Sequence, residues 1–224
     1  MQNADKFQPS PWDSAIFNIP CYELFKPDEQ SLNQASKNPG HYTVKVEALA
    51  DKALLHHYGF YYTDTLIEPY ATQDQFTPHK HPEATVDSHP SLDKLLPMCD
   101  KSFVYGRFHR DFNLPADQAD QRYKQWLSQL HAEGAVLGLR YQSDMMGFIA
   151  FNGGDLLLHS IAARFRGQGI AKHVWTAAIE YLFSIGEKEI HSSVSAANLA
   201  VLNLYASLGF RFNKAQDIYH RLTK

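Results

Sequence analysis

Cysteine is nearly absent from this chain of 224 residues, which contains only Cys21 and Cys99. Two thiols exclude a disulfide framework of the kind that stabilises small secreted domains, and they exclude any zinc site built from cysteines. We therefore expect two free thiols and a fold stabilised by a hydrophobic core. The length allows one large domain or two small ones, and we favour two.

Long apolar runs and an excess of positive charge are also missing. The longest apolar stretch, residues 145–151, is far too short to span a bilayer, and the N-terminal MQNADKFQPSPWD has no apolar run typical of a signal peptide. The formal net charge of −3 gives no overall reason to bind nucleic acid or an anionic membrane. We expect a cytoplasmic protein with neither of these as a partner.

The hydrophobic periodicity alternates between strand-like and helix-like segments, which predicts a mixed α/β fold. We expect a small N-terminal α/β unit over residues 1–76, a linker over residues 77–91 and a second unit over residues 92–224. The linker has three prolines and no periodicity. Its three histidines, His79, His81 and His89, have no carboxylate or cysteine at helical spacing, so we predict that no metal binds there. The tail, residues 210–222, is expected to form two final strands.

A short internal similarity links the two units. Residues 54–61 (LLHHYGFY) parallel residues 204–211 (LYASLGFR), and each segment reads as a helix end, a glycine and the start of an aromatic strand. The pattern is compatible with an internal half-repeat or with chance, because these elements recur in many proteins.

The most informative stretch is the turn Arg-Phe-Arg-Gly-Gln-Gly at residues 164–169, between an apolar strand and a helix that starts near Ile170. Gly167 and Gly169 allow successive N–H groups to converge where the helix N-terminus adds partial positive charge, which suits a phosphate group. A Walker loop would need Gly-Lys followed by Ser or Thr. A dinucleotide fingerprint would need a third small residue where this chain has Lys172, so both alternatives are disfavoured.

The turn resembles motif A of the GCN5-related N-acetyltransferases (GNAT), and the spacing of Asn198, Tyr205, Gly209 and Phe210 resembles their motif B. The resemblance covers residues 92–224. It implies a GNAT-like mixed central sheet whose fourth and fifth strands, residues 155–163 and 190–195, splay apart around acetyl-CoA. The cofactor-binding residues that it implies are Ile161, Ala163, Arg164, Arg166, Gly167, Gln168, Gly169, Ile170, Ala171 and Asn198.

A narrower resemblance is carried by Arg107-Phe108 and by residues 123–127, YKQWL. These segments are similar to those of bacterial dTDP-fucosamine acetyltransferases. The resemblance implies acetyl transfer, by direct attack in a ternary complex, to the amino group of a nucleotide-linked deoxyamino sugar for surface polysaccharide. It points to Arg107, His109 and Asp111 as substrate residues, although this loop is one residue longer here and the last two need not correspond. We expect no metal cofactor, and a homodimer is among the expected assemblies.

The proposed chemistry needs a base for the amine, stabilisation of the carbonyl oxygen and a proton for the departing thiolate. The resemblance assigns the last task to Tyr205, whose phenol is a donor at neutral pH. His159 shares a strand face with Ile161, and Asp64 follows the Gly59-Phe60 pair where the sugar-acetylating relatives carry an acid. We regard His159 and Asp64 as equal candidates for the base.

The sequence is compatible with two other functions. The acceptor could be a peptide, a polyamine or an aminoglycoside, of which an acidic pocket would favour the polyamine. The chain could also bind coenzyme A as a sensor without catalysis, in which case there would be no turnover to lose when Tyr205 is changed.

Overall fold

The computed structural model describes residues 6–224. Its helices are α1 (Pro11–Phe17), α2 (Glu29–Lys37), α3 (Ala53–His57), α4 (Leu92–Leu95), α5 (Ala116–Ala132), α6 (Ala171–Ser184) and α7 (Leu199–Ser207), with short 3₁₀ turns η1 (Leu96–Cys99) and η2 (Ala163–Phe165). Its strands are β1 (Phe7–Pro9), β2 (Cys21–Leu24), β3 (Gly40–Glu47), β4 (Tyr61–Thr72), β5 (Ala84–Asp87), β6 (Val136–Tyr141), β7 (Asp144–Asn152), β8 (Asp155–Ile161), β9 (Glu189–Ser192), β10 (Val194–Ser195) and β11 (Arg211–Thr223).

All these strands belong to one mixed sheet with the order β1-β2-β3-β11-β4-β9-β8-β7-β6-β5, while β10 pairs with β4 beside this path. The pairs β2–β3 and β8–β9 are parallel, and the other neighbouring pairs are antiparallel. The mixed α/β fold expected from the periodicity is therefore confirmed.

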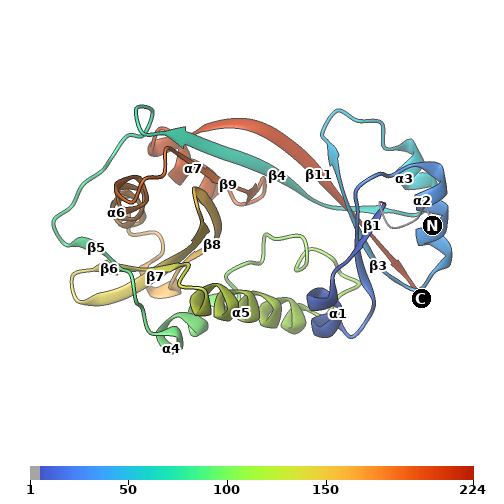
Figure 1. Cartoon of the computed structure of the whole chain (residues 1–224), viewed down its shortest axis with the longest axis horizontal. Coiled ribbons are helices and arrows are strands. Elements are labelled where there is room, and N and C mark those ends of the chain that lie inside the picture. Colours follow the sequence, from blue (N-terminus) through green and yellow to red (C-terminus); the bar gives the residue numbers. More distant parts are fainter. Residues whose placement is uncertain (1–5) are drawn as a thin grey trace.

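Two long strands connect the halves of the molecule (Figure 1). Strand β4 starts among the N-terminal elements and ends beside β9, whereas β11 starts beside the end of β4 and ends paired with β3. Each strand follows a short helix and a glycine in the left-handed region, Gly59 with φ +71° and Gly209 with φ +81°. The two similar sequence segments thus lead into two antiparallel neighbours that each reach into the other half.

The hydrophobic core is divided among the two faces and the two halves of the sheet. In the C-terminal half, α6 and α7 cover one face through residues such as Trp175, Ile179 and Tyr205. The opposite face is covered by α4, η1 and α5 through residues such as Leu95 and Leu127. Two smaller clusters stabilise the N-terminal half, and one of them joins α1 to the residues that precede and begin α5.

Two details differ from the sequence expectation. The segment 77–91, expected to be a linker without regular structure, contains β5, which pairs with β6 and forms an edge of the sheet. The tail forms the single strand β11 and not two strands, with register shifts relative to β4 between Phe212 and Lys214 and between Ile218 and Tyr219. Bulges absorb the extra residues without a turn, and the segment contains no glycine or proline that would favour one. The division into two units stays a prediction.

The helices of the described range, residues 6–224, include none that is both long and apolar enough to cross a bilayer.

Candidate acetyl-transfer site

A gap opens between β8 and the strand that follows it in the sheet. Strands β8 and β9 are paired only at Asp155–His191 and Leu156–Ser192, after which β8 continues along β7 and the chain beyond β9 turns to pair with β4 through β10. The N–H of Ala162 donates to Met146 on the β7 side, at 2.8 Å. Because backbone groups alternate along a strand, the N–H and C=O of Ile161 point into the gap. This is the splayed geometry that the sequence predicted.

The glycine turn lies where the gap meets the start of α6. Gly167 and Gly169 have φ values of +75° and +76°, and within residues 6–224 no atom beyond the adjacent residues lies within 4 Å of the Cβ position of either glycine. Within residues 6–224, the N–H groups of residues 167–170 have no hydrogen-bond partner. A helix N-terminus whose N–H groups have no partner in the protein is suited to bind an anion such as the diphosphate of a cofactor.

The two arginines of the glycine turn form hydrogen bonds that stabilise the turn. Arg166 donates from Nε to the carbonyl of Ile161 at 2.8 Å and from Nη2 to Ser102 Oγ at 2.6 Å. Arg164 donates from Nη2 to Asp144 Oδ1 at 3.4 Å. The backbone carbonyl of Arg164 accepts from Gln168 Nε2 at 2.7 Å. These two arginines were expected to bind the cofactor, and the contacts show that they also hold the turn in place.

Substituting Gly169 should weaken cofactor binding. An alanine there places a side chain at positive φ, which costs about 1–2 kcal/mol, and disturbs the N–H groups that would bind the diphosphate. We expect the Kd for acetyl-CoA, measured by calorimetry, to rise about tenfold or more. Gly134→Ala is the matched control, because Gly134 also has positive φ, +73°, and also faces open space. Equal loss of affinity in both variants would contradict this site.

Tyr205 and His159 meet beside the gap on the face covered by α6 and α7. The hydroxyl of Tyr205 lies 3.2 Å from His159 Nε2, and the His159 ring packs edge-on against Trp175. Asn198 caps α7 by accepting from the N–H of Val201, which fixes the helix that carries Tyr205. Burial raises the pKa of Tyr205 to about 12 and lowers the pKa of His159 to about 4. At neutral pH the phenol is therefore protonated and the imidazole is neutral.

Asp64 lies on β4 and is fully buried. Its Oδ1 accepts from Arg110 Nη1 at 2.6 Å, from Ser195 Oγ at 2.7 Å and from the N–H of Thr65 at 2.9 Å. Its Oδ2 has no partner within residues 6–224. Burial raises the pKa of Asp64, although Ser195 and Arg110 act against that shift. Hydrogen bonds thus hold Oδ1 in place, whereas Oδ2 can still accept a hydrogen bond from a water molecule or a ligand.

Arg110 and Ser195 are the residues that sequence reasoning missed. Arg110 belongs to the segment that precedes α5, residues 106–114, and this segment brings its guanidinium to Asp64. We call residues 106–114 the acceptor loop, because they include the three residues that were predicted to contact the acceptor. Ser195 ends β10, and its hydroxyl also accepts from the N–H of Ala197 at 3.2 Å. The sequence signal was indirect: Arg110 lies between the predicted His109 and Asp111, and Ser195 ends the predicted strand.

The three predicted substrate residues have different surroundings. The guanidinium of Arg107 lies 4.9 Å from the centre of the Phe108 ring and makes no hydrogen bond or ion pair with residues 6–224. His109 is bound to Asp120 at 3.0 Å and stacks on Tyr123. Asp111, which we expected to contact substrate, is only 1% exposed, and its carboxylate accepts from buried neighbours, so the structure offers it no direct contact with substrate.

The comparisons with known proteins agree with this geometry. Residues 102–210 match the model of the acetyltransferase (GNAT) family. N-acetylaspartate synthetase of Rattus norvegicus is 37% identical over 65 residues, which cover 29% of this chain and 22% of that protein. A GCN5-related N-acetyltransferase from Sphaerobacter thermophilus aligns with a TM-score of 0.59 at 15% identity, over 84% of this chain and 61% of that one. A functionally unknown conserved protein from Staphylococcus epidermidis aligns with a TM-score of 0.65 at 12% identity, over 100% and 94% of the chains.

The matched regions span less than two thirds of the rat synthetase and of the Sphaerobacter protein, 22% and 61% of their lengths. The solved structures are too distant in sequence to show more than the fold. The family match, however, contains both the glycine turn and Tyr205. Residues 102–210, slightly less than half of the chain, are thus similar to the GNAT acetyltransferase family, whose members use acetyl-CoA as co-substrate.

Proposed function

We propose that this protein transfers the acetyl group of acetyl-CoA to a primary amine by direct attack in a ternary complex. The observation that carries the proposal is the row of N–H groups without a partner at residues 167–170, near a gap that is flanked by the protonated Tyr205. The diphosphate binds at the start of α6, and the pantetheine arm follows the edge of β8 at Ile161 and Ala163. The thioester then lies between the Tyr205 face and the Asp64 face of the sheet.

The two faces divide the catalytic tasks. Tyr205 protonates the departing thiolate, and neutral His159 beside it orients the phenol. Asp64 takes the proton of the attacking amine at its free Oδ2 by way of a water molecule, because the carboxylate itself is buried. This assignment favours Asp64 over His159 as the base, because His159 is bonded to Tyr205 on the α6 and α7 face while Asp64 faces the acceptor loop.

Arg107 supports an acceptor that carries an anionic group. A partly accessible guanidinium without a protein acid suits a phosphate or a carboxylate, and it opposes a polyamine or an aminoglycoside. By the resemblance noted above, our first candidate is a nucleotide-linked deoxyamino sugar for surface polysaccharide, whose diphosphate would meet Arg107. The local similarity to N-acetylaspartate synthetase favours a second candidate, a small amino acid whose carboxylate would meet the same guanidinium.

The test is acetyl-CoA consumption, followed by release of free thiol, with a panel of acceptors. We expect turnover with members that combine a primary amine with a phosphate or carboxylate, and little turnover with spermidine or a basic peptide. A protein that binds acetyl-CoA but acetylates no member of the panel would favour the alternative of a coenzyme A sensor.

Arg107→Gln should raise the KM for the acceptor by about tenfold to a hundredfold, the usual effect of losing a hydrogen bond to a charged group. The KM for acetyl-CoA should stay unchanged. Arg140→Gln is the control, since Arg140 pairs with Asp87 at 3.3 Å on the edge strands, away from the gap. If Arg107→Gln raised the KM for the acceptor and the KM for acetyl-CoA by the same factor, Arg107 would stabilise the fold and would not bind the acceptor.

A further inference from the structure

A second group of polar side chains is buried beneath the acceptor loop. His41 on β3, His220 on β11 and Asp111 are each at most 1% exposed. His41 Nε2 lies 3.0 Å and His220 Nδ1 lies 2.8 Å from the same oxygen, Asp111 Oδ2. Within residues 6–224 these are the only three histidine, cysteine or acidic residues whose ligand atoms all lie within 4.8 Å of one another.

The other oxygen of Asp111 is held separately. Asp111 Oδ1 accepts from the backbone N–H and the side-chain amide of Asn113, at 3.0 and 3.2 Å. The hydroxyl of Tyr61 lies 3.0 Å from both carboxylate oxygens. These bonds turn Oδ2 toward the two imidazoles. Carboxylates and histidines that bind metals are oriented by outer hydrogen bonds of this kind.

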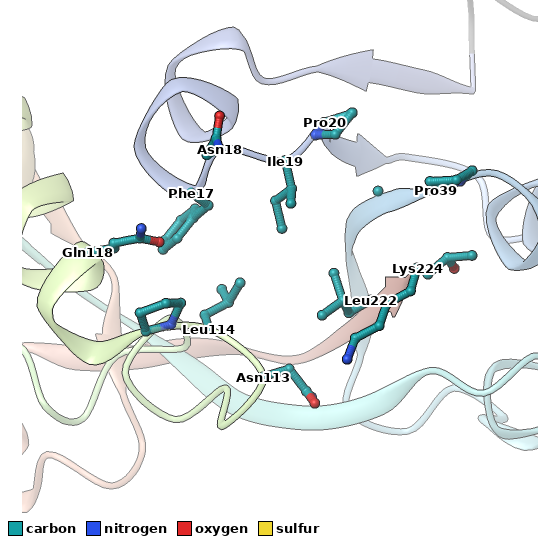
Figure 2. A pocket seen from close by; sticks show the side chains of 13 residues that line it. Phe17, Asn18, Ile19, Pro20, Pro39, Asn113, Leu114, Gln118, Leu222 and Lys224 are labelled. Carbon is teal, nitrogen blue, oxygen red and sulfur yellow. The ribbon is translucent and has the colours of Figure 1, made fainter.

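A cavity lies close to the group and is lined by sequence neighbours and contact residues of its members. This cavity of about 430 Å³ is lined by Gly40, Asn113 and Leu222, together with residues of α1 and of the start of α5. Figure 2 shows the side chains of Asn113 and Leu222 at this cavity. Leu222 is the register partner of His41, so their side chains share one face of the sheet. Asn113 bonds directly to Asp111.

We propose that His41, Asp111 and His220 bind one divalent transition-metal ion, with zinc as the first candidate. Two imidazole nitrogens and one carboxylate oxygen form a donor set typical of zinc, and they disfavour magnesium and calcium, which prefer oxygen alone. Tyr61 or a water molecule supplies the fourth ligand. The sequence predicted no metal site, because the three residues are far apart along the chain and come together only when β11 lies beside β3.

Such an ion would join four parts of the fold: β3, β4 through Tyr61, β11 and the acceptor loop. Its role would be structural, since the three ligands are each at most 1% exposed and belong to two strands and a loop, none of which carries Tyr205. It would hold Asp111 in place, and with it the neighbouring Arg110 that reaches Asp64. The proposal does not depend on the acetyl-transfer reaction.

The experiment uses the full chain, free of any histidine tag, stripped with a chelator and titrated with Co²⁺. We expect visible d–d bands of a four- or five-coordinate ion that saturate at about one equivalent per chain, together with paramagnetic shifts of two histidine rings. Zn²⁺ should displace the cobalt and raise the melting temperature in proportion to its concentration. His220→Gln should abolish the bands, whereas His191→Gln, which changes a histidine at the surface, should retain them.

Absence of the bands in the wild-type chain, without any effect of Zn²⁺ on melting, would overturn the proposal and leave a hydrogen-bonded network. Bands that survive in folded His220→Gln would also overturn it, because the ion would then be bound elsewhere. If His220→Gln does not fold, the paramagnetic shifts in the wild-type protein decide the question. Shifted signals that belong to histidine rings other than His41 and His220 would overturn the proposal.

Discussion

Tyr205→Phe should lower kcat by about a hundredfold to ten-thousandfold, the range attributed to a positioned general acid. The change removes only the hydroxyl, while the ring keeps its packing against Phe210 at a centroid distance of 4.8 Å. Burial keeps the pKa of this phenol near 12, so in the wild type the proton stays available at every pH at which the protein would be assayed. The affinity for acetyl-CoA, measured by calorimetry, should be unchanged.

Tyr42→Phe is the matched control, because Tyr42 is also buried and its hydroxyl also makes a hydrogen bond, to the carbonyl of Asn38 at 3.1 Å. Its kcat should match the wild type. His159→Gln should produce a smaller loss than Tyr205→Phe, since it disturbs the orientation of the acid and leaves the acid present. A Tyr205→Phe variant with full turnover would remove Tyr205 from the chemistry.

Asp64→Asn should lower kcat/KM by a factor of about a hundred or more, because an amide cannot accept the proton of the amine. The side chain keeps its shape, and its bonds to Ser195 and Thr65 can persist. In the wild type, kcat/KM should fall as the pH drops through the pKa of Asp64, which burial holds above the ordinary aspartate value. The base works only when deprotonated, so activity is lost on the acidic side.

The pH profile separates this base from the alternative. Burial lowers the pKa of His159 to about 4, so His159 would also lose its ability to accept a proton on the acidic side. If Asp64 is the base, the acidic limb disappears in Asp64→Asn and persists in His159→Gln. The reverse pattern would assign the base to His159. Circular dichroism must first show that Asp64→Asn is folded, because the change leaves Arg110 without its ionic partner.

Local sequence signals predicted the catalytic half of the fold well. Helix α6 and the glycine turn follow directly from apolar spacing and from Gly167 and Gly169, whose positive φ angles match the expectation. The spacing from Asn198 to Tyr205 places the phenol beside the gap, within hydrogen-bond distance of the predicted His159. These features lie in one continuous segment from β8 to α7, where spacing along the chain carries much of the information.

Contacts between distant segments could not be predicted in the same way. The sequence indicates that residues 211–223 prefer an extended conformation, but it does not state which strand they join. Only the insertion of β11 between β3 and β4 brings His220 to His41 and Asp111. The bond of Arg110 to Asp64 depends on the path of the acceptor loop, and its residues have no periodicity. For the same reason the buried position of Asp111 could not be predicted.

The position of β11 also constrains how the protein is made. During synthesis β3 and β4 leave the ribosome early, yet the strand that lies between them is Arg211–Thr223. At ordinary rates of translation the two strands wait on the order of ten seconds with exposed edges that could pair with other chains. A nascent chain of this topology therefore exposes unpaired strand edges for longer than a fold in which each strand pairs with its predecessor.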